Sequence, residues 1–445
     1  MKQRRQFDLV IIGADAPGLA AAACAARAHP DIAMRVAVVR TGDEPPAGAA
    51  SPGVPDFVWR RLDLHLSDLK ARPVEALVSI FDEERSLATY QNERRTGREL
   101  ERAGADDGRL WADYAGARAR AWREAEEILR GAAKGKNALL SGLGGAKGVR
   151  LGRRLTQSCA EILDDHFDSE ELKTHLSSAA LMPLGLAGDE PGSGLALAAA
   201  SDPAAWRVTA GDRGPSLVKV LEDACAAASV AVFESPVRDI QVADEKTRIV
   251  ELENGETLKA PMVMAGRAAC ETAARLGAAP AFSPLARREG ATAEVRVKLA
   301  RPATPPGEEA EAVFFAAGSR EALKRARDAA LEGRIPDDPP IFFRFVKDEI
   351  VVTAPYCPAV LYTEDERRDW SEQDRQALGR RIVERLGAVL NGAVKNVRRI
   401  EVKVAAREAG VGVVGAGPAR LIAPPATHDE IGAAARLAME LVRGE

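Results

Sequence analysis

The opening of the chain constrains its fold more than any other segment. An apolar run at 7–12 is too short for a helix, and it leads through a glycine turn into the alanine-rich segment 19–26 and a second apolar run at 35–40. Two short apolar runs separated by a helix-length segment are typical of a βαβ unit, and a glycine turn after the first strand is typical of dinucleotide-binding domains. The sequence therefore predicts an α/β fold whose Rossmann-like domain is built on a parallel central sheet.

Two positions in this unit depart from the dinucleotide-binding pattern. The G-x-G-x-x-G fingerprint has three glycines, whereas this chain has Gly13 and Gly18 with Asp15 between them. The second strand ordinarily ends on an acidic residue that binds the ribose, and here it ends on Arg40. The pattern therefore predicts the fold and leaves the cofactor open.

Length, charge and cysteine usage limit the class of protein. At 445 residues the chain is too long for one compact core, so we expect two domains. A formal net charge of −4 gives no reason to expect nucleic acid or an anionic membrane as a partner. No segment approaches the roughly 20 unbroken apolar residues of a transmembrane helix, and the basic residues at 1–5 precede a short strand rather than a signal sequence. The five cysteines are an odd number without C-x-x-C pairs, which favours a reducing compartment and predicts a cytoplasmic protein.

The rest of the chain alternates between strand-like and helix-like patterns, from which two interleaved domains are predicted. The expected elements are a hairpin at 73–90, helices within 96–131 and 151–180, a loop at 135–148, a helix at 217–228, a strand pair at 230–242, a hairpin at 248–260, a strand at 261–266, a mixed region at 291–404, a strand at 411–417 and a helix at 429–442.

We expect the Rossmann-like domain to be discontinuous and to consist of 1–70, 200–285 and 405–445. The substrate-type domain consists of 71–199 and 286–404, and it contains a helical insertion.

Segments spread over nearly the whole chain carry a family resemblance. They lie at 80–90, 95–100, 111–114, 206–217, Val237, Asn254-Gly255, Phe314-Phe315 and 415–417. In their order and spacing they resemble the phytoene dehydrogenase-like branch of the FAD-dependent oxidoreductases. This branch includes carotenoid desaturases and isomerases and the pyridine nucleotide-disulfide oxidoreductase domain-containing proteins. The resemblance implies a flavoprotein fold with FAD as cofactor.

The resemblance also implies which residues contact FAD. It places the pyrophosphate at Gly13 and Gly18, and it places Gly48 near the isoalloxazine. It further implies that Val237 contacts the adenine through its backbone and that Gly415 and Gly417 lie beside the flavin.

Several cofactor-contact positions differ from the family pattern. Asp15 replaces the glycine that allows the backbone to approach the phosphate closely, and Arg40 replaces a glutamate that binds the ribose. Further differences occur at Ala47, at Asp212 and along 418–425, where the family has glycines. Residues of the structural framework match the family pattern, whereas residues expected to contact FAD do not. The sequence therefore leaves open whether FAD binds.

Asp15 has two interpretations that are compatible with each other. A carboxylate about 4 Å from a phosphate charge costs roughly 4 kcal/mol at an effective dielectric near 20, which exceeds the ~0.3–1 kcal/mol that an acidic residue gains at a helix N-terminus. Asp15 is also suited to capping the helix, because Pro17 lies near the first helical position. We hypothesise that its carboxylate occupies the position of the pyrophosphate.

Arg40 also has two interpretations. Either it binds a 2′-phosphate, which would make NADP the cofactor, or it is a solvated residue at the end of the strand, which is the interpretation we favour.

The five histidines lack paired ligand spacing, so we expect no metal site. The chain has neither a G-x-S-x-G elbow nor a phosphate-binding P-loop, and no catalytic residue is assigned.

Two functions remain open. In the first, the protein is an FAD-dependent oxidoreductase that transfers hydride from, or isomerises, an apolar polyene-like substrate. In the second, it is a cofactor-free pseudoenzyme that keeps the fold as a binding or assembly module for a protein partner. Attachment to a membrane surface is an alternative location for an enzyme with an apolar substrate.

Overall fold

The structure is a computed structural model that describes most of the chain. The described residues are 4–29, 32–40, 56–65, 67–69, 74–82, 84–102, 107–133, 145–200, 217–244, 247–265, 288–301, 311–363, 366–390, 394, 396–409, 435, 438–439 and 442. The strand expected at 411–417, most of the loop expected at 135–148 and most of the terminal helix expected at 429–442 lie outside these ranges.

A parallel sheet forms the centre of the first lobe, as the sequence predicts. Its strands are β2 (Leu9–Ile12), β3 (Val36–Val39), β6 (Ala231–Phe233) and β10 (Met262–Ala265), in the order β10-β2-β3-β6. All neighbouring pairs are parallel. Every residue of β2 and β3 is buried, which explains their unbroken apolar runs, because a parallel sheet is covered on both faces.

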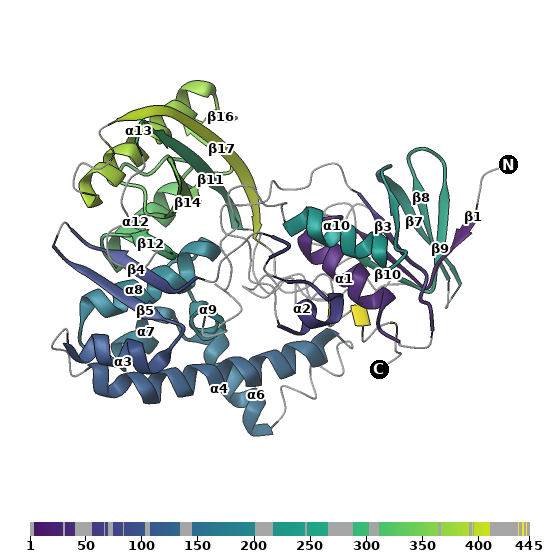
Figure 1. The fold of residues 1–445 in the computed structure, drawn as a ribbon, viewed down its shortest axis with the longest axis horizontal. Helices are drawn as coiled ribbons and strands as arrows, with labels where there is room; N and C mark the ends of the chain where they lie inside the picture. The colour runs from purple at the N-terminus through teal and green to yellow at the C-terminus, as the bar shows by residue number, and fades with distance from the viewer. Residues whose placement is uncertain are drawn as a thin grey trace.

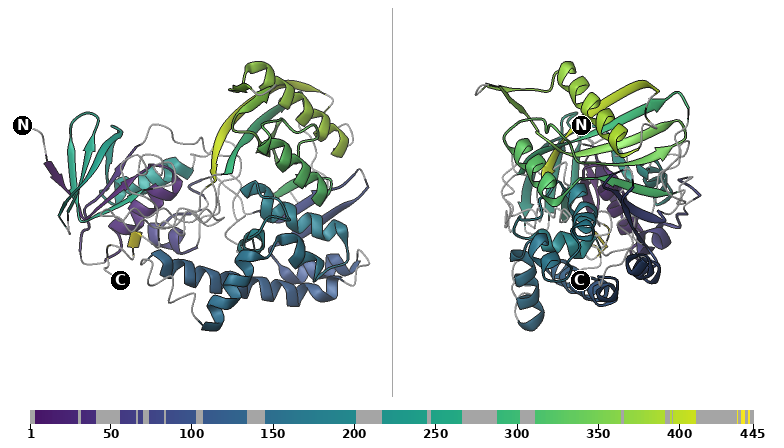
Figure 2. Two further views of the ribbon diagram at one scale, coloured as in Figure 1. Left: turned by 180° about the vertical axis from the view of Figure 1, so that it is seen from behind. Right: turned by 90° about the vertical axis from the view of Figure 1, so that its left-hand side faces the viewer.

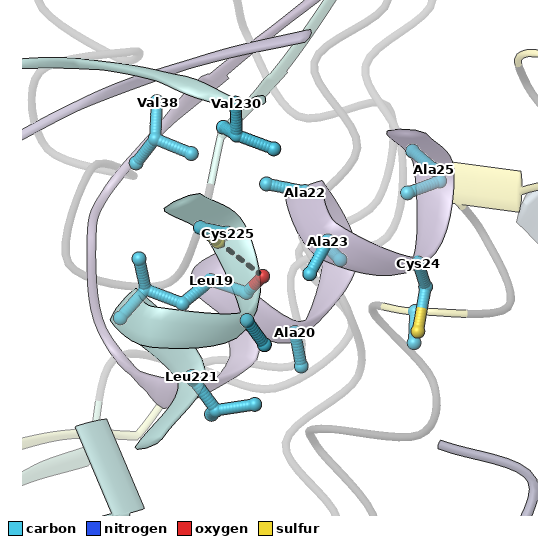
Figure 3. Close-up of a cluster of buried hydrophobic side chains, with 14 of the residues drawn as sticks. Leu19, Ala20, Ala22, Ala23, Cys24, Ala25, Val38, Leu221, Cys225 and Val230 are labelled. Atoms are coloured by element: carbon cyan, nitrogen blue, oxygen red, sulfur yellow. Dashed lines mark hydrogen bonds between the residues drawn. The ribbon is translucent and has the colours of Figure 1, made fainter. Parts of the chain in front are cut away.

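Helix α1 (Ala16–Ala26) follows β2 and is buried on nearly all sides. Small side chains on α1 let α10 (Leu217–Ala227) pack closely against it, and the Cys225 thiol donates a hydrogen bond to the Leu19 carbonyl at 3.3 Å. Figure 3 shows this contact beside Val38 of β3 and Val230. The short helix α2 (Asp56–Leu62) packs against α1 as well. Because α1 is apolar on nearly all sides, its body from Pro17 to Ala25 is buried in the core.

A second sheet of four strands packs beside the first. It contains β1 (Arg4–Gln6), β7 (Val237–Asp244), β8 (Thr247–Leu252) and β9 (Thr257–Ala260), in the order β1-β9-β8-β7. The expected hairpin with the Asn254-Gly255 turn is confirmed, and Gly255 has a φ of 83° that suits glycine. Strand β1 was not expected, because its Arg-Arg-Gln sequence carries no apolar pattern.

The second lobe is organised by a seven-stranded sheet in the order β17-β11-β14-β13-β12-β4-β5. The hairpin expected at 73–90 forms its β4-β5 edge, and β12 pairs with β4 in parallel while the other neighbours are antiparallel. The strands are β4 (Ala76–Ile80), β5 (Ser86–Tyr90), β11 (Arg288–Leu299), β12 (Ala312–Ala316), β13 (Ile341–Val346), β14 (Glu349–Cys357) and β17 (Val397–Ala409), and β15 (Leu361–Thr363) pairs separately with β16 (Glu366–Arg368).

Helices fill most of the two segments for which helical periods predict them. One helix begins at Gly145, inside the loop expected at 135–148, and another lies at Ser193–Ala199, beyond the predicted range. The helices are α3 (Glu93–Arg102), α4 (Asp107–Ala133), α6 (Gly145–Thr156), α7 (Cys159–Asp164), α8 (Glu170–Leu181), the 3₁₀ turn η1 (Met182–Leu184) and α9 (Ser193–Ala199), followed later by α12 (Arg320–Leu331) and α13 (Glu372–Val389). Serine side chains cap several of them: Ser158 begins α7, Ser169 begins α8 and Ser371 begins α13.

The two lobes lie side by side in the ribbon. In Figure 1 the seven-stranded sheet lies on the left with α8, α12 and α13, and the parallel sheet lies on the right with α1 and α10. Strands β11 and β17 extend from the first group toward the second, and the view from behind in Figure 2 shows the same separation. Within the described ranges, no helix combines the length and apolar character needed to cross a membrane.

One buried histidine joins α8 to the edge of the seven-stranded sheet. His175 is fully buried, with its Nδ1 2.8 Å from the Ser79 hydroxyl of β4 and its Nε2 2.8 Å from the Thr89 hydroxyl of β5. Burial, with a smaller contribution from the positive charge of Arg118, lowers the pKa of His175 from about 6.5 to about 3. A neutral imidazole therefore links the two hydroxyls.

We expect acid to destabilise the protein through His175. Below pH 6.5, His175 takes up a proton in the unfolded chain but stays neutral in the folded chain. The contribution of His175 to the free energy of unfolding is therefore fully present above pH 6.5 and falls as pH decreases. At 1.36 kcal/mol per pKa unit, the loss between pH 7 and pH 5 is about 2 kcal/mol. Urea denaturation at the two pH values measures it. His175→Gln should reduce the loss, whereas His65→Gln, at an exposed position, should leave it unchanged; equal losses in all three proteins would contradict this role.

Candidate functional site

The turn between β2 and α1 has the backbone of a dinucleotide-binding turn. Gly13 has a φ of 107°, in a region that favours glycine, and its amide donates to the Val39 carbonyl of β3 at 2.8 Å. A Cβ added to Gly18 would lie 2.1 Å from the Gly13 carbonyl oxygen. Gly18 therefore allows the close approach of helix and strand that the third glycine of the fingerprint provides.

Asp15 caps helix α1 with its side chain. Its backbone is extended, with φ −73° and ψ 174°, and its Oδ1 accepts a hydrogen bond from the Gly18 amide at 2.9 Å. Pro17 lies in the first turn, where its missing N–H costs nothing. The carboxylate thus takes up a helix N-terminal donor of the kind that binds phosphate in this fold.

Arg40 is held by two carboxylates at the carboxyl end of β3. Its Nη2 forms an ion pair with Glu222 of α10, and its Nε lies 3.0 Å from an oxygen of Glu234, which follows β6. The Arg40 side chain is only 24% exposed. Arg40 is therefore paired rather than solvated, and the sequence reasoning missed both of its partners.

The sequence contains a signal for one of these partners. The carboxyl ends of parallel strands meet at one edge of the sheet. The Arg40 amide donates to the Phe233 carbonyl at 2.9 Å, which places Glu234 beside Arg40. Glu222 could not be found this way, because its position depends on how α10 packs.

The remaining candidate residues are placed only in part. Val237 begins β7, and its buried side chain belongs to the same apolar cluster as Ile12, Val39 and Phe233 at the strand ends. Gly48, Gly415 and Gly417 lie outside the described residues. The structure therefore brings Gly13, Asp15 and Gly18 together in one turn. Arg40 follows β3 of the parallel sheet, and Val237 begins β7 of the second sheet.

The described end of the site does not fit the pyrophosphate and ribose of FAD. The Asp15 carboxylate accepts the Gly18 amide hydrogen bond and adds a negative charge where a diphosphate would lie. A carboxylate about 4 Å from a phosphate charge would cost roughly 4 kcal/mol at an effective dielectric near 20. At the ribose position, the guanidinium of Arg40 is engaged by Glu222 and Glu234.

The described residues offer neither a metal site nor a reactive thiol. No group of three histidine, cysteine or acidic side chains there could hold a metal ion. The cysteines that the structure describes, Cys24, Cys159, Cys225 and Cys357, are buried and form no disulfide with one another. Burial raises the pKa of Cys24, Cys159 and Cys225 to about 12, so these thiols are poor nucleophiles.

No protein-family model and no curated protein sequence matches the chain. Solved structures do match it. Wild-type putrescine oxidase bound to putrescine matches with a TM-score of 0.55 and 15% identity, over 99% of this chain and 99% of that one. p-Nitrophenol 4-monooxygenase from Pseudomonas putida matches with a TM-score of 0.51 and 12% identity, over 99% of this chain and 79% of that one. Identities this low show a common fold, and this chain has the Rossmann-like fold of FAD-binding proteins.

Replacing Gly18 tests the close approach of α1 and β2. We expect Gly18→Ala to destabilise the protein by about 1–3 kcal/mol, because the added Cβ overlaps a backbone carbonyl that cannot move freely. Gly387→Ala in α13 is the matched control: its Cβ meets nothing within 4 Å, so it should stabilise by about 0.5–1 kcal/mol. Urea denaturation measures both, and equal effects would contradict the packing at Gly18.

Replacing Asp15 tests the cap in the absence of any cofactor. Asp15→Ala should lower the free energy of unfolding by about 1 kcal/mol, whereas Asp15→Ser keeps a hydroxyl acceptor and should lie close to the parent. The comparison requires only urea midpoints for the three proteins. An alanine variant as stable as the parent would show that the hydrogen bond to Gly18 contributes nothing.

Proposed function

We propose that this protein is a cofactor-free pseudoenzyme that uses the flavoprotein fold as a binding or assembly module. One observation carries the proposal: the Asp15 carboxylate accepts the Gly18 amide at the N-terminus of α1. A phosphate group at this turn would have to break that hydrogen bond and lie beside a negative charge. The ion pairs of Arg40 support the same proposal, because they remove the second polar anchor of the nucleotide from use.

Within this proposal the domains keep the predicted division. The Rossmann-like domain consists of 1–70, 200–285 and 405–445, and the substrate-type domain consists of 71–199 and 286–404. The first domain then serves as a rigid support, and a protein partner or small molecule is bound elsewhere on the chain. A cytoplasmic location belongs to the same proposal.

A second candidate is an FAD-dependent oxidoreductase of the phytoene dehydrogenase-like branch that acts on an apolar polyene-like substrate. It is favoured by the whole-chain extent of the structural match to putrescine oxidase, which spans both lobes. Flavin would supply the hydride chemistry. This function requires Asp15 to leave the N-terminus of α1 when FAD binds.

Flavin titration separates the two candidates. We expect the parent to purify without flavin and to leave the fluorescence of added FAD unquenched. Removing roughly 4 kcal/mol of repulsion should make Asp15→Gly and Asp15→Ser bind FAD about a thousandfold more tightly than the parent. Asp15→Glu keeps the charge and should behave like the parent.

Two results would count against these expectations in different ways. A parent protein that purifies with one FAD per chain would overturn the cofactor-free proposal and support the oxidoreductase. A folded Asp15→Gly variant that gains no affinity would overturn the blocking role of Asp15.

A further inference from the structure

Strand β17 lies at one end of the seven-stranded sheet, in the second lobe. It is 13 residues long and pairs with β11 on its inner side over its whole length. Among the described residues, no strand pairs with its outer side. In Figure 1 it runs along the outer margin of the lobe. Such an edge presents a row of backbone N–H and C=O groups that can pair with another strand.

The two faces of β17 carry different side chains. On one face, Ile400 and Val402 lie against α13, since a Cβ added to Gly379 of that helix would lie 3.0 Å and 3.1 Å from their Cγ2 atoms. Ile400 nevertheless remains 36% exposed. On the other face, Arg399 and Glu401 form an ion pair with an Nη2–Oε1 distance of 2.8 Å, and their side chains are 70% and 41% exposed. The edge therefore presents an exposed apolar residue with opposite charges on either side of it in the chain.

The order of these charges makes the strand complementary to itself. A two-fold axis perpendicular to the sheet would pair two copies of β17 in antiparallel fashion. With the axis at Ile400, Arg399 lies opposite the partner's Glu401, and Glu401 lies opposite the partner's Arg399. With the axis at Arg399 or at Glu401, two like charges would lie directly opposite each other, which is destabilising. Charges on an edge strand usually prevent pairing, but in this sequence their order favours pairing when the axis lies at Ile400.

We propose that β17 pairs with β17 of a second copy of this chain, antiparallel and centred on Ile400, to form a two-fold dimer. Backbone hydrogen bonds and the contact between the two Ile400 side chains supply the affinity. The charges set the register, because exposed ion pairs contribute little energy. A single strand pair is a small interface, so the dimer dissociates on dilution. The pairing lies in the second lobe and does not depend on whether FAD binds.

Two charge reversals test the pairing, because each removes the complementarity of the strand with its own copy. Arg399→Glu brings acidic residues against each other on both sides of the axis, and Glu401→Arg brings basic residues together. Each variant alone should self-associate at least about tenfold more weakly than the parent. A mixture of the two variants restores opposite charges at both places and should form a heterodimer about as tight as the parent dimer. Sedimentation velocity at several concentrations measures all four samples.

A cysteine at the axis tests the register. Ile400→Cys should give a disulfide-linked dimer under mild oxidation, because directly opposite side chains in an antiparallel pair have Cβ atoms about 4.5–5.5 Å apart. Val402→Cys should not, since the two cysteines would lie on either side of the axis and apart along the strands. The parent under the same oxidant measures any linking through the native cysteines.

Arg367→Glu is the matched control, because it reverses a charge in β16, whose residues are all exposed. This variant should self-associate like the parent. A parent that stays monomeric at every concentration would overturn the proposal, as would charge-reversal variants that associate like the parent or a mixture of them that does not associate. A disulfide link through Val402→Cys rather than Ile400→Cys would overturn the register.

Discussion

One hydrogen bond, from the Gly18 amide to the Asp15 carboxylate, caps helix α1 and is the basis of the proposed function. In a dinucleotide-binding turn the N-terminus of the helix offers N–H donors and a positive field to a phosphate. Here a carboxylate of the chain itself uses one of those donors and remains in the field. In our proposal, the contact that begins α1 therefore opposes an anionic ligand at this turn while the fold is kept.

At Arg40, too, a position that contacts the cofactor in dinucleotide-binding domains instead contacts other residues of the chain. Instead of an acidic residue that would bind ribose, β3 ends on a guanidinium that joins the end of β3 to Glu222 of α10 and Glu234 after β6. The Arg40 ion pairs tie the end of β3 to α10 and to the residue after β6, whereas the Asp15 cap is local to α1. A lobe held together in this way suits the supporting role that we propose for it.

Much of the fold could be predicted from the sequence because its signals are local. The strand, turn and helix at 7–26, the β4-β5 hairpin and the Asn254-Gly255 turn each depend on residues close together in the chain. Strand β1 escaped prediction because it is stabilised by pairing with β9, more than 250 positions away, rather than by its own composition. For the site, sequence could identify Asp15 as a cap but could not find Glu222, because its contact with Arg40 depends on how α10 packs against α1.

The most direct measurement is a crystal structure of the parent protein grown with FAD in large excess. Electron density showing the Asp15 carboxylate on the Gly18 amide, with no diphosphate at the N-terminus of α1, is the predicted result. An ordered FAD with its diphosphate on that turn and Asp15 rotated away would contradict the central claim.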